Sequence, residues 1–186
     1  MPVTALDPKT ALIIIDLQKG IVSLPAVHPI EGVIKRVSTM AAAFREQGLP
    51  VVLVNVTGSP TVRTEQPRPN RAFPAGWADL IPELNRQPQD HTVTKNTPGA
   101  FTKTDLETYL QALGITQIVI AGVATSSGVE VTARQAYELG FNIAFPIDAM
   151  TDIAADAHNY SVTRVFPKIG ETGTTDEIIS ILKRRA

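Results

Sequence analysis

Apolar, β-branched runs alternate with amphipathic helical patterns along this chain, and this alternation limits the possible folds more than any other feature. The run TALIIID at Thr10–Asp16 is apolar almost throughout, as expected of a strand that is covered on both faces. The stretch Glu31–Gly48 has apolar residues at helical spacing and ends on glycine, a common helix C-cap. Strands that alternate with helices predict βαβ units and a mainly parallel sheet. We therefore expect a three-layer α/β/α, Rossmann-like fold.

The same criteria assign the remaining elements. Further strands are expected at Leu49–Val56, His91–Lys95, Ile115–Val123 and Phe141–Ala149. Further helices are expected at Thr104–Gly114, Ser127–Gly140, Asp152–Phe166 and Thr174–Arg185. The segment Gly170–Thr175 before the last helix is expected to be a cap or an interface loop.

Length and charge narrow the range of functions. The 186 residues suffice for one domain with a substantial core, so we expect a single domain over residues 1–186. A net charge of −1 gives no electrostatic reason to expect nucleic acid or a membrane surface as a partner. The chain has no cysteine, which excludes disulfides, thiolate metal sites and a cysteine nucleophile. With no pattern of a signal peptide or membrane span, we expect a cytoplasmic protein.

The segment Thr57–Asp90 interrupts the alternation. It is rich in Pro, Arg and Gln and has no sustained period, and long loops in compact domains are usually functional or disordered. Phe73 and Trp77 suggest that parts of it pack. We expect an insertion close to the site or at a subunit contact.

Three polar features fall at the ends of predicted strands. Asp16 ends the first strand, Lys95 ends the third, and the turn Gly122–Gly128 follows the fourth. Ligands of open α/β sheets bind outside the carboxyl ends of the strands, where the strand order reverses. We therefore expect Asp16 and Lys95 to lie within about 4 Å of each other, close to this turn. Each residue alone is a weak signal, because such an Asp is more often a cap and such a Lys is more often exposed.

The turn itself has two readings. Ser127 and Glu130 fit the capping box S-x-x-E, which makes Ser127 the N-cap and Gly128 the first helical residue. A cysteine at Gly128 would be reactive, since it would lie beside free backbone N–H groups and the positive end of the helix dipole. Glycine keeps those N–H groups and supplies no nucleophile.

The turn resembles that of the isochorismatase-like hydrolases, the cysteine hydrolase superfamily, whose pattern is roughly G-V-x-T-x-x-C-V-x-x-T-A-R. Gly128 replaces the cysteine, and the other positions match at Gly122, Val123, Thr125, Val129, Thr132, Ala133 and Arg134. LIIIDLQKG and TKNTPGAFTKTDL are similar to two further family segments, in the same order. The resemblance implies catalytic roles for Asp16 and Lys95, with Gly128 at the place of the missing nucleophile. It also implies a cis peptide bond at Val123–Ala124, a substrate-binding turn of Val123, Ala124 and Ser127, and a homo-oligomer.

The chemistry implied by the resemblance depends on residue 128. Amide-cleaving members use an Asp–Lys–Cys triad, which this chain lacks. Isochorismatases also have glycine there and cleave a vinyl ether, for which Asp16 would be the acid and Lys95 would hold negative charge. The first hypothesis is therefore a hydrolase that acts on a small molecule without a cofactor. The second is a catalytically silent binding or assembly protein, and a third, weaker one uses Ser126 or Ser127 as the nucleophile.

Several other features are interpreted as structural. VNVTGSPTVR contains no histidine, so the metal site of nicotinamidases is not expected here. We expect Arg134, Glu130 and His158 to order the fold. A dinucleotide-binding loop is disfavoured, because the turn lacks G-x-G-x-x-G.

Overall fold

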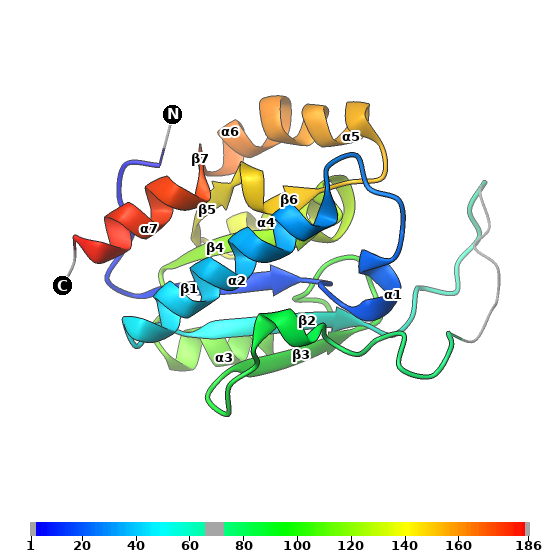
Figure 1. Cartoon of the computed structure of the whole chain (residues 1–186), viewed down its shortest axis with the longest axis horizontal. Coiled ribbons are helices and arrows are strands. Elements are labelled where there is room, and N and C mark those ends of the chain that lie inside the picture. Colours follow the sequence, from blue (N-terminus) through cyan, green and yellow to red (C-terminus); the bar gives the residue numbers. More distant parts are fainter. Residues whose placement is uncertain (1–2, 66–72, 185–186) are drawn as a thin grey trace.

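The centre of the molecule is a parallel β-sheet, whose strands lie side by side in Figure 1 with α2 in front of them. A computed structural model describes residues 3–65 and 73–184. In this part of the chain the sheet has seven strands, with the order β3-β2-β1-β4-β5-β7, and β6 pairs with β4. All the pairings are parallel. The strands are β1 (Thr10–Ile15), β2 (Val51–Val56), β3 (His91–Lys95), β4 (Gln117–Val123), β5 (Asn142–Pro146), β6 (Met150–Thr151) and β7 (Glu171–Gly173).

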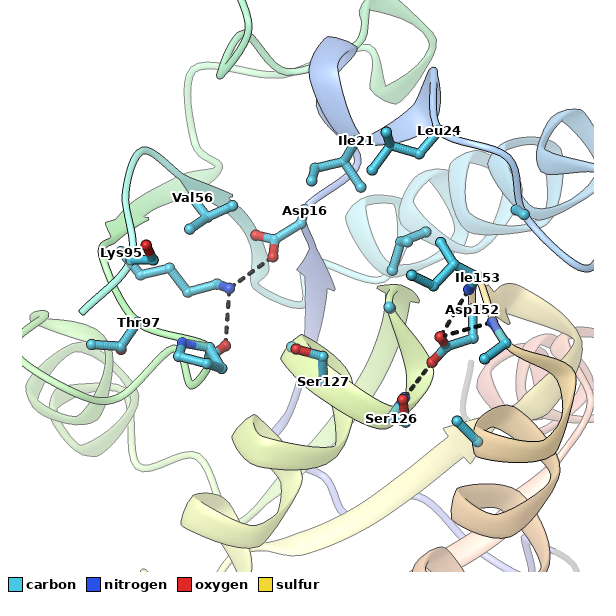
Figure 2. A pocket seen from close by; sticks show the side chains of 18 of the residues that line it. Asp16, Ile21, Leu24, Val56, Lys95, Thr97, Ser126, Ser127, Asp152 and Ile153 are labelled. Carbon is cyan, nitrogen blue, oxygen red and sulfur yellow. Dashed lines mark hydrogen bonds and ion pairs between the residues drawn. The ribbon is translucent and has the colours of Figure 1, made fainter. Parts of the chain in front are cut away.

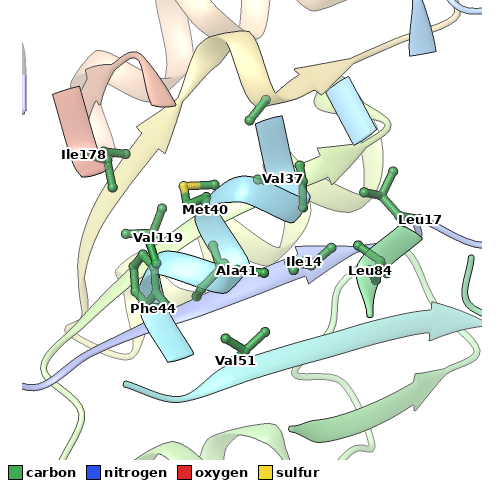
Figure 3. Close-up of a cluster of buried hydrophobic side chains, with 14 of the residues drawn as sticks. Ile14, Leu17, Val37, Met40, Ala41, Phe44, Val51, Leu84, Val119 and Ile178 are labelled. Carbon is green, nitrogen blue, oxygen red and sulfur yellow. The ribbon is translucent and has the colours of Figure 1, made fainter. Parts of the chain in front are cut away.

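The two central strands are buried on both faces, as their continuous apolar sequences predict. Every residue of β1 and β4 is buried. Successive side chains point to opposite faces of the sheet, so Leu12 and Ile14 enter one core while Ala11, Ile13 and Ile15 enter the other. Figure 3 shows the first core, in which Met40 and Phe44 of one helix lie over the sheet.

Helices cover both faces, which confirms the predicted three-layer α/β/α fold with a mainly parallel sheet. Side chains of α2 and α7 share the core of Figure 3, while those of α3, α4 and α6 share the core on the other face. The helices are α1 (Lys19–Val22), α2 (Ile30–Glu46), α3 (Leu106–Ala112), α4 (Glu130–Glu138), α5 (Ala155–Tyr160), α6 (Phe166–Ile169) and α7 (Thr175–Lys183). No helix in the described residues has the length and apolar character needed to cross a bilayer.

The glycines that the sequence analysis took as helix ends do follow the observed helices. Gly48, Gly114 and Gly140 follow α2, α3 and α4 and have φ values of 64°, 64° and 85°, a region that favours glycine. The segment before the last helix does contain a cap, because Thr174 and Glu177 form a reciprocal capping box. It also contains β7, which the sequence analysis missed.

Most predicted elements differ from the observed ones by a few residues at their ends, and two of these differences affect the site. The strand expected to run to Ala149 ends at Pro146, and a 3₁₀ turn at Ile147–Ala149 leads into the short strand β6. The helix expected from Asp152 begins only at Ala155, because the Asp152 carboxylate turns back to accept hydrogen bonds from backbone N–H groups. Arg185, the expected last helical residue, lies outside the described residues.

Part of the insertion lies beside the candidate site, as predicted. Its described residues, 57–65 and 73–90, include a 3₁₀ turn at Pro82–Leu84. Trp77 stacks on Phe73 and covers Gly20 so closely that a Cβ there would overlap the indole ring. Gly58 and Ser59 line the main cavity. Residues 66–72 of the insertion lie outside the described residues.

Candidate functional site

Asp16 and Lys95 form a buried ion pair at the carboxyl edge of the sheet. Lys95 Nζ lies 2.7 Å from Asp16 Oδ2, within the predicted 4 Å, and also donates a hydrogen bond of 2.9 Å to the Pro98 carbonyl. Figure 2 shows the two side chains pointing toward each other over the cavity. The side chains are only 8% (Asp16) and 1% (Lys95) exposed. The pair is therefore largely shielded from water.

The sheet topology explains why these two residues meet. β3 lies two strands from β1, and the long lysine side chain spans the strand between them. The backbone of Asp16 extends the ladder, because its N–H donates to the Val54 carbonyl at 3.0 Å. Asp16 then has φ 52°, an uncommon left-handed conformation that Asp tolerates better than most residues. The chain thus turns sharply where its carboxylate enters the cavity.

Burial makes Asp16 an unusually weak acid for a carboxyl group, so that it holds its proton closer to neutral pH. Desolvation raises the pKa of Asp16 from 3.8 to about 6, although the charge and the hydrogen bond of Lys95 both lower it. Its second oxygen, Oδ1, is buried and accepts no hydrogen bond from the described residues. A proton on Asp16 would therefore reside on Oδ1, because Oδ2 is bound to Lys95.

The turn after β4 differs from its prediction. The Val123–Ala124 peptide bond is cis, as the resemblance implied. Ser127 is not an N-cap, since a π-helical turn begins at Thr125 and runs to Val129 before α4 starts. Glu130 does not fold back onto Ser127. Its carboxylate instead accepts hydrogen bonds from Ser161 Oγ at 2.6 Å and Arg134 Nε at 2.9 Å, which gives both Glu130 and Arg134 a structural role.

The backbone N–H groups of this turn are less free than expected. Those of Ser127 and Val129 both donate to the Ala124 carbonyl, at 3.1 and 3.2 Å. That of Ser126 donates to Asp152 Oδ2 at 2.7 Å. These three N–H groups are already bonded inside the protein, so they do not contribute to an anion-binding cradle.

Gly128 lies directly against the ion pair. A Cβ added to Gly128 would be 3.2 Å from Asp16 Oδ2 and 2.8 Å from Ile15 Cγ2. A side chain at this position would therefore take up space beside the Asp16 carboxylate. With glycine, the turn packs directly against Ile15 and the Asp16 carboxylate.

Asp152 and His158 hold the outer side of the turn. Asp152 is buried, and its Oδ1 also accepts a hydrogen bond from the Ile153 N–H at 2.8 Å. His158 Nδ1 lies 2.8 Å from the Thr125 hydroxyl, and burial together with the nearby His28 ring lowers the pKa of His158. The structural role expected of His158 is consistent with this contact. Sequence reasoning missed Asp152, because the two-residue strand that precedes it, β6, was not predicted.

These residues surround a cavity of about 420 Å³. The predicted residues Val123, Ala124 and Ser127 line it together with the ion pair and Gly128. Apart from Ser126, named above as a possible nucleophile, the sequence analysis did not single out its other walls, which are mostly apolar. They comprise Ile21, Leu24, Ala26, Ile30, Val56, Gly58, Ser59, Thr97, Pro98, Ser126, Asp152, Ile153, Ala154 and Ala157.

The described residues contain no group of three or more His, Cys, Asp or Glu side chains placed to hold a metal ion. Ser126 and Ser127 both line the cavity. Among the described residues, neither hydroxyl donates a hydrogen bond to Asp16.

The sequence between Thr10 and Glu177 matches the model of the isochorismatase domain family over residues 10–177. The chain belongs to the isochorismatase family. A family protein of Bacillus subtilis (strain 168), YwoC, is 38% identical over 182 residues, which cover 94% of this chain and 95% of the relative. The solved structure of a family protein from Burkholderia thailandensis has a TM-score of 0.93 and 39% identity, covering 96% of this chain and 98% of the other.

A more distant relative is named for an enzymatic activity. Streptothricin hydrolase of Streptomyces noursei is 32% identical over 140 residues, which cover 75% of this chain and 48% of that enzyme. Family membership thus agrees with the fold and with the position of the cavity at the carboxyl edge of the sheet.

Proposed function

We propose that this chain is a hydrolase that cleaves a vinyl ether or a related bond in a small molecule, with Asp16 and Lys95 as its acid–base pair. The observation that carries the proposal is the Asp16 carboxyl group. It faces a cavity, has a pKa of about 6 and keeps one oxygen free of hydrogen bonds from the described residues. Such a group can donate a proton near neutral pH, since roughly a tenth of it is protonated at pH 7. The relationship to streptothricin hydrolase supports a hydrolytic reaction.

The reaction has three steps. Asp16 gives its proton to the terminal carbon of the vinyl ether, which leaves a cation at the carbon bonded to the ether oxygen. Water adds to that carbon and its proton returns to Asp16. The resulting hemiketal collapses to an alcohol and a ketone, so that one water is consumed and no nucleophile from the protein is needed.

Lys95 and Gly128 serve this reaction in different ways. The ammonium of Lys95 fixes Oδ2 and stabilises the carboxylate that remains after the proton has left. Gly128 lets the turn approach the Asp16 carboxylate closely, because a Cβ there would lie only 2.8 Å from Ile15 Cγ2. The chain has no cysteine to form an acyl-enzyme, which argues against the acyl transfer of the amide-cleaving members.

The test is hydrolysis of methyl 2-(cyclohexyloxy)acrylate, a vinyl ether, followed by release of cyclohexanol across pH 4–9. We expect turnover that falls above pH 6, and a loss of about 10²–10⁴-fold in Asp16→Asn. Asp79→Asn is the matched control, because Asp79 forms an exposed ion pair with Lys19. Turnover that is unchanged in Asp16→Asn would refute the proposed role.

A second candidate is a catalytically silent binding or assembly protein on the same fold. The absence of any cysteine, and of a side chain at residue 128, favours it. Tight binding of ligands by the wild-type protein without turnover of any vinyl ether would support this candidate over the first.

A further inference from the structure

The two ends of the cavity differ in chemical character. The ion pair lies at the inner end, whereas Leu24 and Ile153 lie at the outer end and line the same cavity (Figure 2). These two side chains are large and apolar, yet they are 48% and 66% exposed. A single exposed leucine is ordinary on a protein surface, but two that converge on one cavity indicate a site where a ligand covers them.

The outer apolar walls are held in place by the backbone. Leu24 follows α1, and its N–H donates to the Ile21 carbonyl at 3.1 Å. Val27 N–H donates to the Asp152 carbonyl at 2.8 Å, which joins the segment of Leu24 to that of Ile153. The two apolar walls are therefore preorganised, and a ligand need not order them on binding.

The charged groups that line the described part of the cavity are two carboxylates and one ammonium, from Asp16, Asp152 and Lys95. Both oxygens of Asp152 already accept backbone hydrogen bonds, and the Lys95 ammonium is shared between Asp16 and the Pro98 carbonyl. An anionic ligand would meet two negative groups and an ammonium that is already engaged. An uncharged ligand meets no such repulsion.

We infer that the cavity takes an uncharged substrate whose hydrolysable bond is attached to a ring-sized apolar body, and that Leu24 and Ile153 select this body. The inference rests on the proposed function, because it takes the ion pair as the reacting end of the cavity. It adds the class of substrate and two specificity-determining residues.

Binding of ethers that cannot be hydrolysed tests the inference without any need for turnover. The probes are methyl 2-(cyclohexyloxy)propanoate, its free carboxylate, and methyl 2-methoxypropanoate, which lacks the ring. Dissociation constants are measured by calorimetric titration at pH 7.5. We expect the cyclohexyl ester to bind at least ten-fold more tightly than either of the other two probes, because it alone is uncharged and also carries the apolar ring.

Substitutions locate the binding of the ring. Leu24→Ser and Ile153→Ser are each expected to weaken binding of the cyclohexyl ester about five-fold and to leave the methoxy ester unchanged. Leu113→Ser, a similarly exposed leucine at the end of α3, is the control and should change neither constant. Circular dichroism confirms that each variant is folded.

Tighter binding of the carboxylate, equal binding of the ring and methoxy esters, or no binding of any probe would overturn the inference. These outcomes differ from a failure of the proposed function. If the cyclohexyl ester binds as expected but the corresponding vinyl ether is not hydrolysed, the binding class stands and the hydrolytic mechanism does not.

Discussion

Replacing Lys95 with Met should raise the pKa of Asp16 well above its value in the wild-type protein. Burial raises this pKa from 3.8 to about 6, and Lys95 limits the rise through its charge and its hydrogen bond of 2.7 Å. Methionine keeps most of the length and volume of the lysine side chain but removes both effects. The variant therefore isolates the contribution of the ammonium group.

The size of the change follows from the geometry. The rise from 3.8 to about 6 corresponds to about 3 kcal/mol against ionisation, at about 1.4 kcal/mol for each pKa unit. An opposite charge in direct contact lowers the pKa of a carboxyl group by about 1–3 units. Removing it should bring the pKa of Asp16 to about 8, so the carboxyl group of the variant would be largely protonated at pH 7.

The altered pKa also changes how stability depends on pH. Because the folded-state pKa of Asp16 exceeds its unfolded value, its contribution to stability is fully present below about pH 4 and is lost as pH rises through the folded-state pKa. In the wild-type protein this loss is complete a little above pH 6. In Lys95→Met it should continue to about pH 8, with a slope of about 1.4 kcal/mol per pH unit between pH 6 and 8.

The pKa is measured from the ¹³C chemical shift of the Asp16 carboxyl group during a pH titration, and stability from urea unfolding at pH 5, 6, 7 and 8. Lys19→Met is the matched control, since Lys19 forms an exposed ion pair of 3.0 Å with Asp79. This control should leave the Asp16 pKa unchanged and cost less than about 1 kcal/mol. A wild-type pKa near 4, or a pKa that does not change in Lys95→Met, would refute the reasoning and remove the basis for Asp16 as an acid.

Three further predictions concern the turn and the last helix. Gly128→Cys should give a thiol with a pKa below the usual ~8.5, measured from the rate of alkylation by iodoacetamide against pH. This pKa should rise when Lys95→Ala is added. A pKa that does not respond to the second substitution would show that the ion pair does not influence residue 128. Thr174→Ala should cost about 1 kcal/mol in urea unfolding by removing the cap of α7, and an unchanged midpoint would contradict the capping role. Because the pKa of His158 is lowered in the folded state, its contribution to stability is fully present above about pH 6.5 and is lost as pH falls from there through the folded-state pKa. His158→Gln should abolish that part of the pH dependence, while the wild-type protein retains it.

The fold was predictable because its main signals are local. Continuous burial on both faces left β1 and β4 with uninterrupted apolar sequences, and a glycine after α2, α3 and α4 marked the helix ends. The short strands β6 and β7 were missed for the opposite reason. They have two and three residues, and their pairing with β4 and β5 depends on the surrounding sheet rather than on their own sequence.

The site was predictable only in part. The rule that ligands bind at the carboxyl ends of parallel strands selected Asp16 and Lys95, and the structure brings the two side chains together. The same rule selects Asp152 only once β6, the strand that precedes it, is known. The apolar residues Leu24 and Ile153 could not be selected in this way, because a single exposed leucine or isoleucine is ordinary on a protein surface. Only the structure shows that both line the same cavity.

The failed capping box shows why the turn itself could not be derived from its own sequence. Ser127 and Glu130 satisfy the local pattern, but the N–H of Ser126 finds its acceptor in Asp152, which is 26 residues away. The Thr125 hydroxyl finds its partner in His158, 33 residues away. Because these remote groups satisfy the start of the helix, it begins two residues before Ser127, and Glu130 is free to bind Ser161 instead. The turn is thus fixed from its outer side by the segment that follows β6, and its inner side is left to Asp16, Lys95 and a ligand. A change in Asp152 or His158 should therefore be transmitted to the position of Gly128, although neither residue touches the ion pair.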